Sequence, residues 1–180
     1  MTTGLVLVDI QNDYFPGGSM TLAGMHPASE KAARLLKQFR ENHWPTFHVQ
    51  HIAVSRTAMF FLPGSDGAEL HAAIQPLPGE TVITKHFPNS FRETDLEQEL
   101  RDARVKELVI CGAMSHMCID ATVRAAVDLG FDCTVVQDAC ATRDLEFKGK
   151  TIPADLVHGA FMSALAAAYA RVVSLDELTL

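Results

Sequence analysis

The sequence lacks the features of a secreted or membrane-inserted protein. Its 180 residues include only four cysteines, and no two of them have the Cys-x-x-Cys spacing. A disulfide framework is therefore not expected, and a reducing cytoplasm is the simplest location. No apolar run approaches the roughly 20 residues that a membrane-spanning helix needs. The first residues, Met-Thr-Thr-Gly, also lack the basic segment of a signal peptide.

Positive charge is scarce as well. Lys and Arg number 15 against 22 Asp and Glu, so the formal net charge is -7, and no basic run offsets it. This balance argues against a nucleic-acid partner. Internal repeats, low-complexity segments and interdomain linkers are absent, and the chain is long enough for one substantial core. We therefore expect a single domain over residues 1–180.

Short apolar runs alternate with segments of helical periodicity. An uninterrupted apolar run such as 4–10 is typical of a strand buried on both faces. The alternation predicts an α/β fold, a three-layer sandwich with a mainly parallel central sheet and helices on both faces. Residues 51–79 and 140–152 are expected to be loops, the former a lid, a binding loop or an assembly surface. Further strands are predicted near 46–50, 80–84, 106–111, 131–137 and 171–174, and helices near 27–42, 94–103, 118–129 and 153–170.

Three reactive side chains follow predicted strands. Asp9 and Lys85 each end a strand, and Cys118 opens the helix after 106–111. In parallel sheets the ligand binds beyond the carboxyl ends of the strands, so we expect the three to meet there. A thiol at a helix N-terminus faces unpaired N–H groups and the positive end of the helix dipole. With Lys85 nearby, these groups predict a lowered pKa for Cys118 and a thiolate nucleophile.

An Asp and a Lys can support a cysteine nucleophile. Asp9 would take the proton of Cys118 and later give it to the leaving group, while Lys85 would hold Asp9 in place. Backbone N–H groups at the helix start, including that of Cys118, would bind the oxyanion of a tetrahedral intermediate. The predicted reaction is acyl transfer to water through a thioester, with a small amide or imide as the natural substrate.

Four segments, in this order along the chain, resemble the isochorismatase-like cysteine hydrolases, which include nicotinamidases and N-carbamoylsarcosine amidases. The matching segments are Leu7–Asp13, Val82–Lys85 with Asn89–Phe91, Gly112–Cys118 and Val136–Ala139. The resemblance covers nearly the whole chain and implies the isochorismatase-like, Rossmann-type fold of that family. It also implies an Asp9–Lys85–Cys118 triad and no organic cofactor.

The resemblance further implies a non-proline cis peptide shortly before the nucleophile. Here it would join Ala113 to Met114 and turn backbone N–H groups toward the oxyanion, so the oxyanion hole is assigned to Ala113, Met114 and Cys118. The resemblance places a substrate pocket beside the nucleophile. Its predicted walls are Gln11, Phe15, Phe91 and Met114.

The sequence departs from the nicotinamidases at their metal site, an Asp and two His after the second strand. The corresponding segment, His48-Val49-Gln50-His51, lacks the Asp. Residues i and i+3 of a strand point to opposite sides, so His48 and His51 are unsuited to share a metal with His71 or His86. No metal is predicted, and the four histidines are read as loop or core residues.

The presence of Cys118 favours amide hydrolysis, because isochorismatases that cleave a vinyl ether lack this cysteine. The segment Met114–Asp120 is nearest to a branch similar to streptothricin-type lactam hydrolases. Three alternatives stay open: vinyl-ether hydrolysis, a binding protein on the same fold, and a redox-sensing thiol. The expected partners are a small-molecule substrate and further copies of the chain, as a dimer or tetramer, but neither nucleic acid nor membrane.

Overall fold

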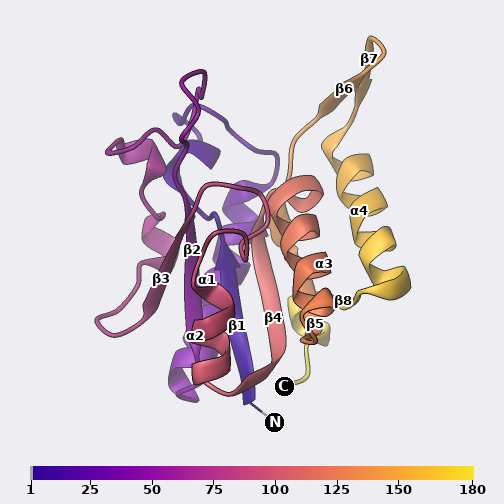
Figure 1. Ribbon diagram of the computed structural model, residues 1–180. Helices are drawn as coiled ribbons and strands as arrows, with labels where there is room; N and C mark the ends of the chain where they lie inside the picture. The colour runs from indigo at the N-terminus through magenta and orange to yellow at the C-terminus, as the bar shows by residue number, and fades with distance from the viewer. Residues whose placement is uncertain (1) are drawn as a thin grey trace.

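The computed structural model, which describes residues 2–180, has a six-stranded sheet at its centre (Figure 1). The strand order is β3-β2-β1-β4-β5-β8, and every neighbouring pair is parallel. The carboxyl ends of the strands therefore lie along one edge. The strands are β1 (Thr2–Val8), β2 (Thr46–His51), β3 (Thr81–Lys85), β4 (Val105–Ala113), β5 (Asp132–Ala141) and β8 (Ala170–Val173).

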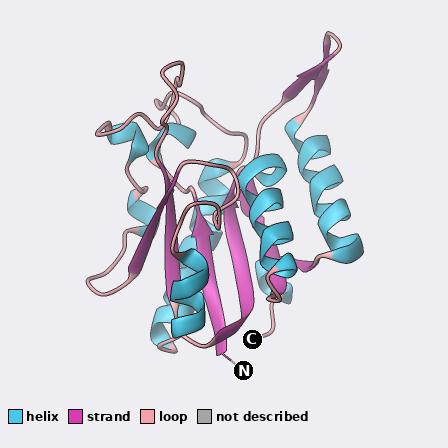
Figure 2. Ribbon diagram, in the orientation of Figure 1, coloured by secondary structure: helices cyan, strands magenta, loops and turns pink. Residues whose placement is uncertain are grey.

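Helices cover both faces of the sheet. Figure 2 shows two of them in front of the strands, α2 (Leu96–Asp102) and α3 (Asp120–Asp128), with α1 (Met25–Glu41) behind. The fourth, α4 (Ala154–Ala168), lies beside α3 near the β8 edge. These three layers confirm the predicted fold class. Among the helices of residues 2–180, none combines the length and the apolar character needed to cross a bilayer.

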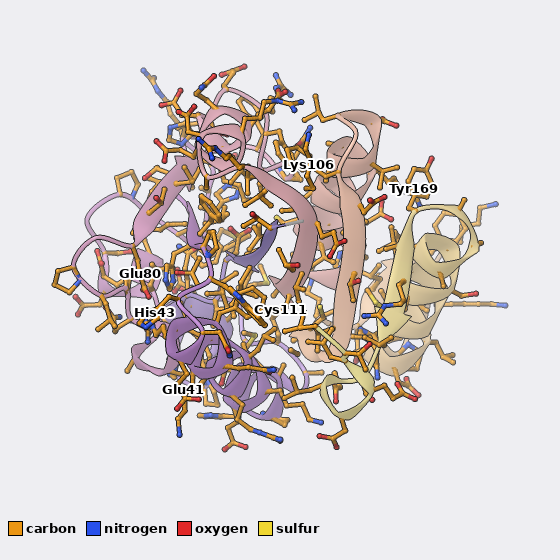
Figure 3. All side chains as sticks on the ribbon, turned by 90° about the horizontal axis from the view of Figure 1, so that it is seen from below. Glu41, His43, Glu80, Lys106, Cys111 and Tyr169 are labelled. Carbon is orange, nitrogen blue, oxygen red and sulfur yellow. The ribbon has the colours of Figure 1, made fainter. Side chains whose placement is uncertain are left out.

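The core follows the apolar pattern of the sequence. The run Leu5–Val8 in β1 lies between β2 and β4 and is at most 1% exposed. Figure 3 shows Cys111 of β4 near the middle of the molecule, and this thiol is fully buried. Burying apolar side chains on both sides of the sheet supplies the main driving force for this fold. The inward stripe of α1, with its 3.6-residue period, is also buried: Ala32, Leu35, Leu36 and Phe39.

The prediction that residues 140–152 form a loop is wrong in two respects. β5 continues to Ala141, and β6 (Leu145–Phe147) and β7 (Lys150–Ile152) form an antiparallel hairpin that projects from the body in Figure 1. Its two-residue turn, Lys148-Gly149, has positive φ at both positions, 51° and 72°. Such turns match the twist of paired strands, and short strands of mixed polarity give little periodic signal.

Candidate active site

Asp9, Lys85 and Cys118 meet at the carboxyl ends of β1, β3 and β4. The ammonium Nζ of Lys85 lies 2.8 Å from Oδ2 of Asp9 and 3.2 Å from Sγ of Cys118. The side chains of Asp9 and Lys85 are 0% exposed, and Cys118 is 4% exposed. The fold thus brings three residues that are distant in sequence into direct contact, sheltered from water.

Asp9 has an unusual backbone conformation. Its φ of 52° lies in the left-handed region, which Asp tolerates better than most residues and which ends the regular alternation of β1. Within residues 2–180, neither carboxylate oxygen accepts a hydrogen bond of standard geometry, although Oδ2 forms the ion pair with Lys85. The carboxylate therefore retains free acceptor capacity beside the thiol.

A tight turn after β4 positions Cys118. Gly112 has a φ of 123°, and a Cβ at this position would collide with the Val8 carbonyl oxygen of β1, so only glycine fits. The Ala113–Met114 peptide is cis, at the position that the family resemblance implies. A π-helical turn, η4 (Ser115–Ile119), follows and leads into α3. This turn places the thiol over the end of β4.

The backbone of this turn is arranged around one carbonyl. The Met114 oxygen accepts the N–H groups of Met117, at 3.0 Å, and of Ile119, at 3.2 Å. The N–H of Cys118 lies between these two donors in the chain. A helix start of this kind directs N–H groups toward its N-terminal side, where an anion is stabilised.

The Lys85 ammonium is the cation at the centre of the site. Its three hydrogen-bond acceptors are His51 Nδ1 at 3.0 Å, the Phe87 carbonyl at 3.0 Å and Cys118 Sγ at 3.2 Å, and it forms the ion pair with Asp9 Oδ2 at 2.8 Å. Asp9, His51 and Cys118 are also a set of possible metal ligands, with ligand atoms within 4.8 Å of one another. Because Nζ contacts all three, a metal ion does not fit between them while Lys85 is in place.

Burial and charge set the pKa values of this cluster. Burial raises the pKa of the Cys118 thiol, and the Asp9 carboxylate raises it further, which outweighs the opposing effect of Lys85. The predicted lowering of this pKa is therefore wrong, because the site is more deeply buried than a helix N-terminus on a surface. Burial alone would lower the pKa of Lys85, but the Asp9 carboxylate and Cys118 raise it, so the amine stays protonated.

The four histidines considered for a metal do not converge. His48 contacts Glu80 Oε2 through Nε2 at 2.9 Å, and His51 contacts Lys85, so the two face opposite sides of β2. His71 stacks on the Phe15 ring at 3.6 Å, and His86 Nδ1 lies 2.8 Å from the Ile52 carbonyl.

Two of the predicted pocket walls make other contacts. Gln11 is fully buried, and its amide makes three bonds to backbone: Nε2 donates to the carbonyls of His51 and Ala68, and Oε1 accepts the N–H of His51. It is a structural link between segments. Phe91 packs against Phe131, which follows α3 in the chain, with ring centroids 6.1 Å apart. This contact occupies one side of the Phe91 ring, and its place in the substrate pocket stays a prediction.

The other two predicted walls remain near the carboxyl edge. Met114 is 8% exposed and starts the turn that carries Cys118. Phe15 lines a cavity of about 540 Å³ together with Leu62 and His71, between the first loop and the loop 51–79. The loop 51–79 thus packs against the first loop at this cavity, and its role as a lid, a binding loop or an assembly surface stays a prediction.

Sequence reasoning missed the contact between His51 and Lys85. The two residues are register partners at the ends of β2 and β3. The signal was available in principle, because a residue that ends β2 must lie at the same edge as Asp9 and Lys85 once β2 is placed between β1 and β3. Only the strand order, which the sequence does not state, turns this into a contact.

Comparison with known proteins adds an independent finding. Residues 3–177 match the model of the isochorismatase domain family. The isochorismatase family protein YddQ of Bacillus subtilis is 55% identical over 172 residues, which cover 96% of each chain. A crystallised Oleispira antarctica protein assigned to the isochorismatase hydrolases is 55% identical, with a TM-score of 0.94 over 98% of this chain and 95% of that one.

A streptothricin hydrolase from Streptomyces noursei is 32% identical over 141 residues, which cover 78% of this chain and 50% of that protein. The family match spans nearly all of the residues that form the sheet, its covering helices and the buried Asp9–Lys85–Cys118 cluster. The chain therefore belongs to the isochorismatase family of hydrolases.

Proposed function

We propose that the protein is a cysteine-dependent hydrolase of a small amide, imide or lactam. The observation that carries this proposal is the buried contact of Lys85 Nζ with both Asp9 and Cys118, at 2.8 Å and 3.2 Å. A nucleophile, a proton acceptor and a fixed positive charge are the parts that acyl transfer needs. Asp9, Lys85 and Cys118 are the proposed catalytic residues, and no cofactor takes part.

In the first half-reaction Sγ of Cys118 attacks the substrate carbonyl carbon. Because the raised pKa keeps the resting thiol protonated, the proton passes to the Asp9 carboxylate as the C–S bond forms. The oxyanion accepts hydrogen bonds from backbone N–H groups of the turn, and the N–H of Cys118 is the main proposed donor. The C–N bond then breaks, the leaving nitrogen takes the proton from Asp9, and a thioester remains.

In the second half-reaction water replaces the amine. Asp9 accepts a proton from the water, whose oxygen attacks the thioester carbon. The C–S bond breaks, the acid product leaves, and the proton held by Asp9 returns to Sγ. Lys85 keeps its proton throughout and neutralises charge on Asp9 and on sulfur in turn, so its role is electrostatic.

The direct test replaces the nucleophile. Cys118→Ala should abolish hydrolysis of an amide panel, for example succinimide, a lactam and an acylurea, while its circular dichroism and unfolding midpoint stay near those of the wild type. Cys133→Ala is the matched control, since this buried thiol lies in β5 away from Asp9 and Lys85. Full activity of the Cys118→Ala protein would contradict the mechanism.

A second candidate function is vinyl-ether hydrolysis, which the name of the matching family favours. That reaction needs protonation of a carbon atom and no thiol nucleophile. It would therefore survive Cys118→Ala and fail in Asp9→Asn. Assaying both variants on isochorismate and on the amide panel separates the two reactions.

We also propose a cytoplasmic homo-oligomer, a dimer or a tetramer. The four cysteines are all free thiols, which suits a reducing compartment. Apolar side chains on α4 and in the hairpin stay exposed, including Leu156 at 61% and Phe147 at 63%. Light scattering on the purified protein tests the oligomeric state.

A further inference from the structure

His51 is placed rigidly at the edge of the site. Its backbone N–H donates to Gln11 Oε1 at 2.8 Å, and its carbonyl accepts from Gln11 Nε2 at 2.9 Å. Its ring lies 5.8 Å from that of Phe61. Three atoms lie within 4.8 Å of one another: a ring nitrogen of His51, a carboxylate oxygen of Asp9 and Sγ of Cys118. The imidazole therefore lies beside the Asp9–Lys85–Cys118 cluster.

The contact with Lys85 determines which ring nitrogen carries the hydrogen. A Lys ammonium donates and cannot accept, so Nδ1 of His51, 3.0 Å from Nζ, must be the acceptor. A neutral imidazole whose Nδ1 accepts carries its hydrogen on Nε2. The pKa of His51 is lowered to about 4 by burial and by the Lys85 charge, so the ring is neutral at pH 7.

The resulting Nε2–H donor is not used within the chain. No hydrogen-bond partner for Nε2 is found among residues 2–180, where His51 makes its side-chain contact through Nδ1. The fully buried polar atoms without a partner in that part of the chain are Asp9 Oδ1 and Oδ2 and His48 Nδ1. Since Nε2 of His51 is not among them, it is not fully buried, and it belongs to the same ring whose Nδ1 contacts Lys85.

We propose that the Nε2–H of His51 donates a hydrogen bond to a second carbonyl oxygen of the substrate, next to the scissile amide. This assignment rests on the proposed function and narrows its substrate class to acylureas and imides, in which a second carbonyl flanks the same nitrogen. A simple amide offers no acceptor there. A neutral N–H donor suits a neutral carbonyl oxygen, so His51 selects by hydrogen bonding and leaves the charge chemistry to Asp9 and Lys85.

The test compares two alkylating probes that differ by one carbonyl group. Iodoacetamide and 2-iodoacetylurea carry the same reactive carbon, and the second probe adds a urea carbonyl. Rates of Cys118 labelling are measured by peptide mass spectrometry and divided by the rates with glutathione. We expect the wild type to prefer iodoacetylurea by about three- to tenfold, the effect of one hydrogen bond.

Variants separate the two roles of the ring. His51→Asn keeps an acceptor near Nδ1 and removes the distal donor, so it should lose the preference. His51→Gln can place an amide N–H near Nε2 and should recover part of it. His43→Asn is the matched control, because His43 is exposed at the other end of the sheet and its φ of 56° suits Asn.

The outcomes distinguish an error in the role of His51 from an error in the proposed function. If Cys118 reacts but the wild type shows no preference, or if His51→Asn keeps the preference, the role of His51 is wrong while the cysteine mechanism stands. If Cys118 reacts with neither probe even at the most alkaline pH at which the fold stays intact, the proposed function is wrong and the inference with it. Three results together would support the role of His51. His51→Asn loses the preference for iodoacetylurea, His51→Gln recovers part of it, and His43→Asn keeps all of it.

Discussion

The Cys118 thiol lies between two opposite charges in a space with little water. The Asp9 carboxylate destabilises a thiolate, while the Lys85 ammonium, 3.2 Å from Sγ, stabilises one. Burial adds to the effect of Asp9, so the balance favours the neutral thiol at rest. Attack must then be coupled to proton transfer. Lys85 lowers the energy of that transfer in the buried site, because its charge stabilises the developing thiolate.

The pH dependence of Cys118 alkylation checks this balance. With a raised thiol pKa, the rate should still be climbing above the ordinary value of about 8.5, with no plateau near neutrality. Lys85→Met removes the charge that lowers this pKa, so labelling at pH 8 should slow by about tenfold for each unit that the pKa rises.

Two controls accompany that measurement. Lys85→Arg keeps a positive charge beside Asp9 and should slow labelling less than Lys85→Met. Cys140, buried in β5, reports labelling caused by unfolding. A plateau well below pH 8.5 would show instead that the resting site holds a thiolate–ammonium pair, and would overturn the coupled proton transfer.

At the scale of elements, one buried carboxylate joins two loops at the carboxyl edge. Oδ1 of Asp13 accepts the N–H of Ser19 at 2.9 Å, and Oδ2 accepts the N–H of Phe61 at 2.6 Å. Phe61 is further held by its carbonyl, which accepts from Ala53 at 2.8 Å. Asp13 thus fixes the middle of the loop 51–79, whose wall of Leu62 and His71 faces Phe15.

Asp13→Asn should loosen this loop. An amide offers one acceptor oxygen where the carboxylate offers two, so one buried N–H loses its partner, at a cost of about 1–3 kcal/mol. Urea unfolding and limited proteolysis within 53–65 measure the effect. Asp66→Asn, at an exposed position of the same loop, is the control. Unchanged proteolysis of the Asp13→Asn protein would show that the two bonds do not hold the loop.

The elements also show why some features could be predicted from sequence. The apolar pattern of residues 4–10 and of the buried stripe of α1 predicts a strand and a helix. Because Asp9, Lys85 and Cys118 each follow a predicted strand, the sequence also predicts that these three residues lie at one edge of the sheet. The hairpin β6–β7 and the turn η4 have no such period, because they depend on φ values and on contacts from distant strands. The pKa of Cys118 and the role of Gln11 depend on burial, which only the assembled fold sets.

At the scale of the whole molecule, the end of the sheet opposite the active site is held by charge. Glu80, just before β3, forms two bonds of 2.7 Å with Arg40 of α1 and contacts His48 of β2 at 2.9 Å. Glu80 and His43 line the same cavity on this side. Figure 3, which views the molecule from below, labels both residues. The network ties the helix behind the sheet to two of its strands.

This network predicts how the stability of the whole fold responds to acid. Burial alone would raise the pKa of Glu80, but hydrogen bonds from Arg40, the Leu77 N–H and His48 lower it from 4.5 to about 2. A carboxylate with a lower pKa in the folded state stabilises the fold fully above its unfolded pKa. That stability is lost as the pH falls from about 4.5 to about 2.

Glu80→Gln should therefore be less stable than the wild type by about 2 kcal/mol at pH 7, since it loses hydrogen bonds to a charged partner. The difference should shrink as the pH falls below 4.5, because protonated Glu80 resembles Gln. Urea unfolding at pH 7, 5 and 3 measures it. Glu41→Gln, whose exposed pair with Lys37 has a 3.7 Å contact, should show little difference at any pH. A Glu80→Gln deficit that stayed constant down to pH 3 would mean that packing around the side chain, and not its charge, joins α1 to the sheet.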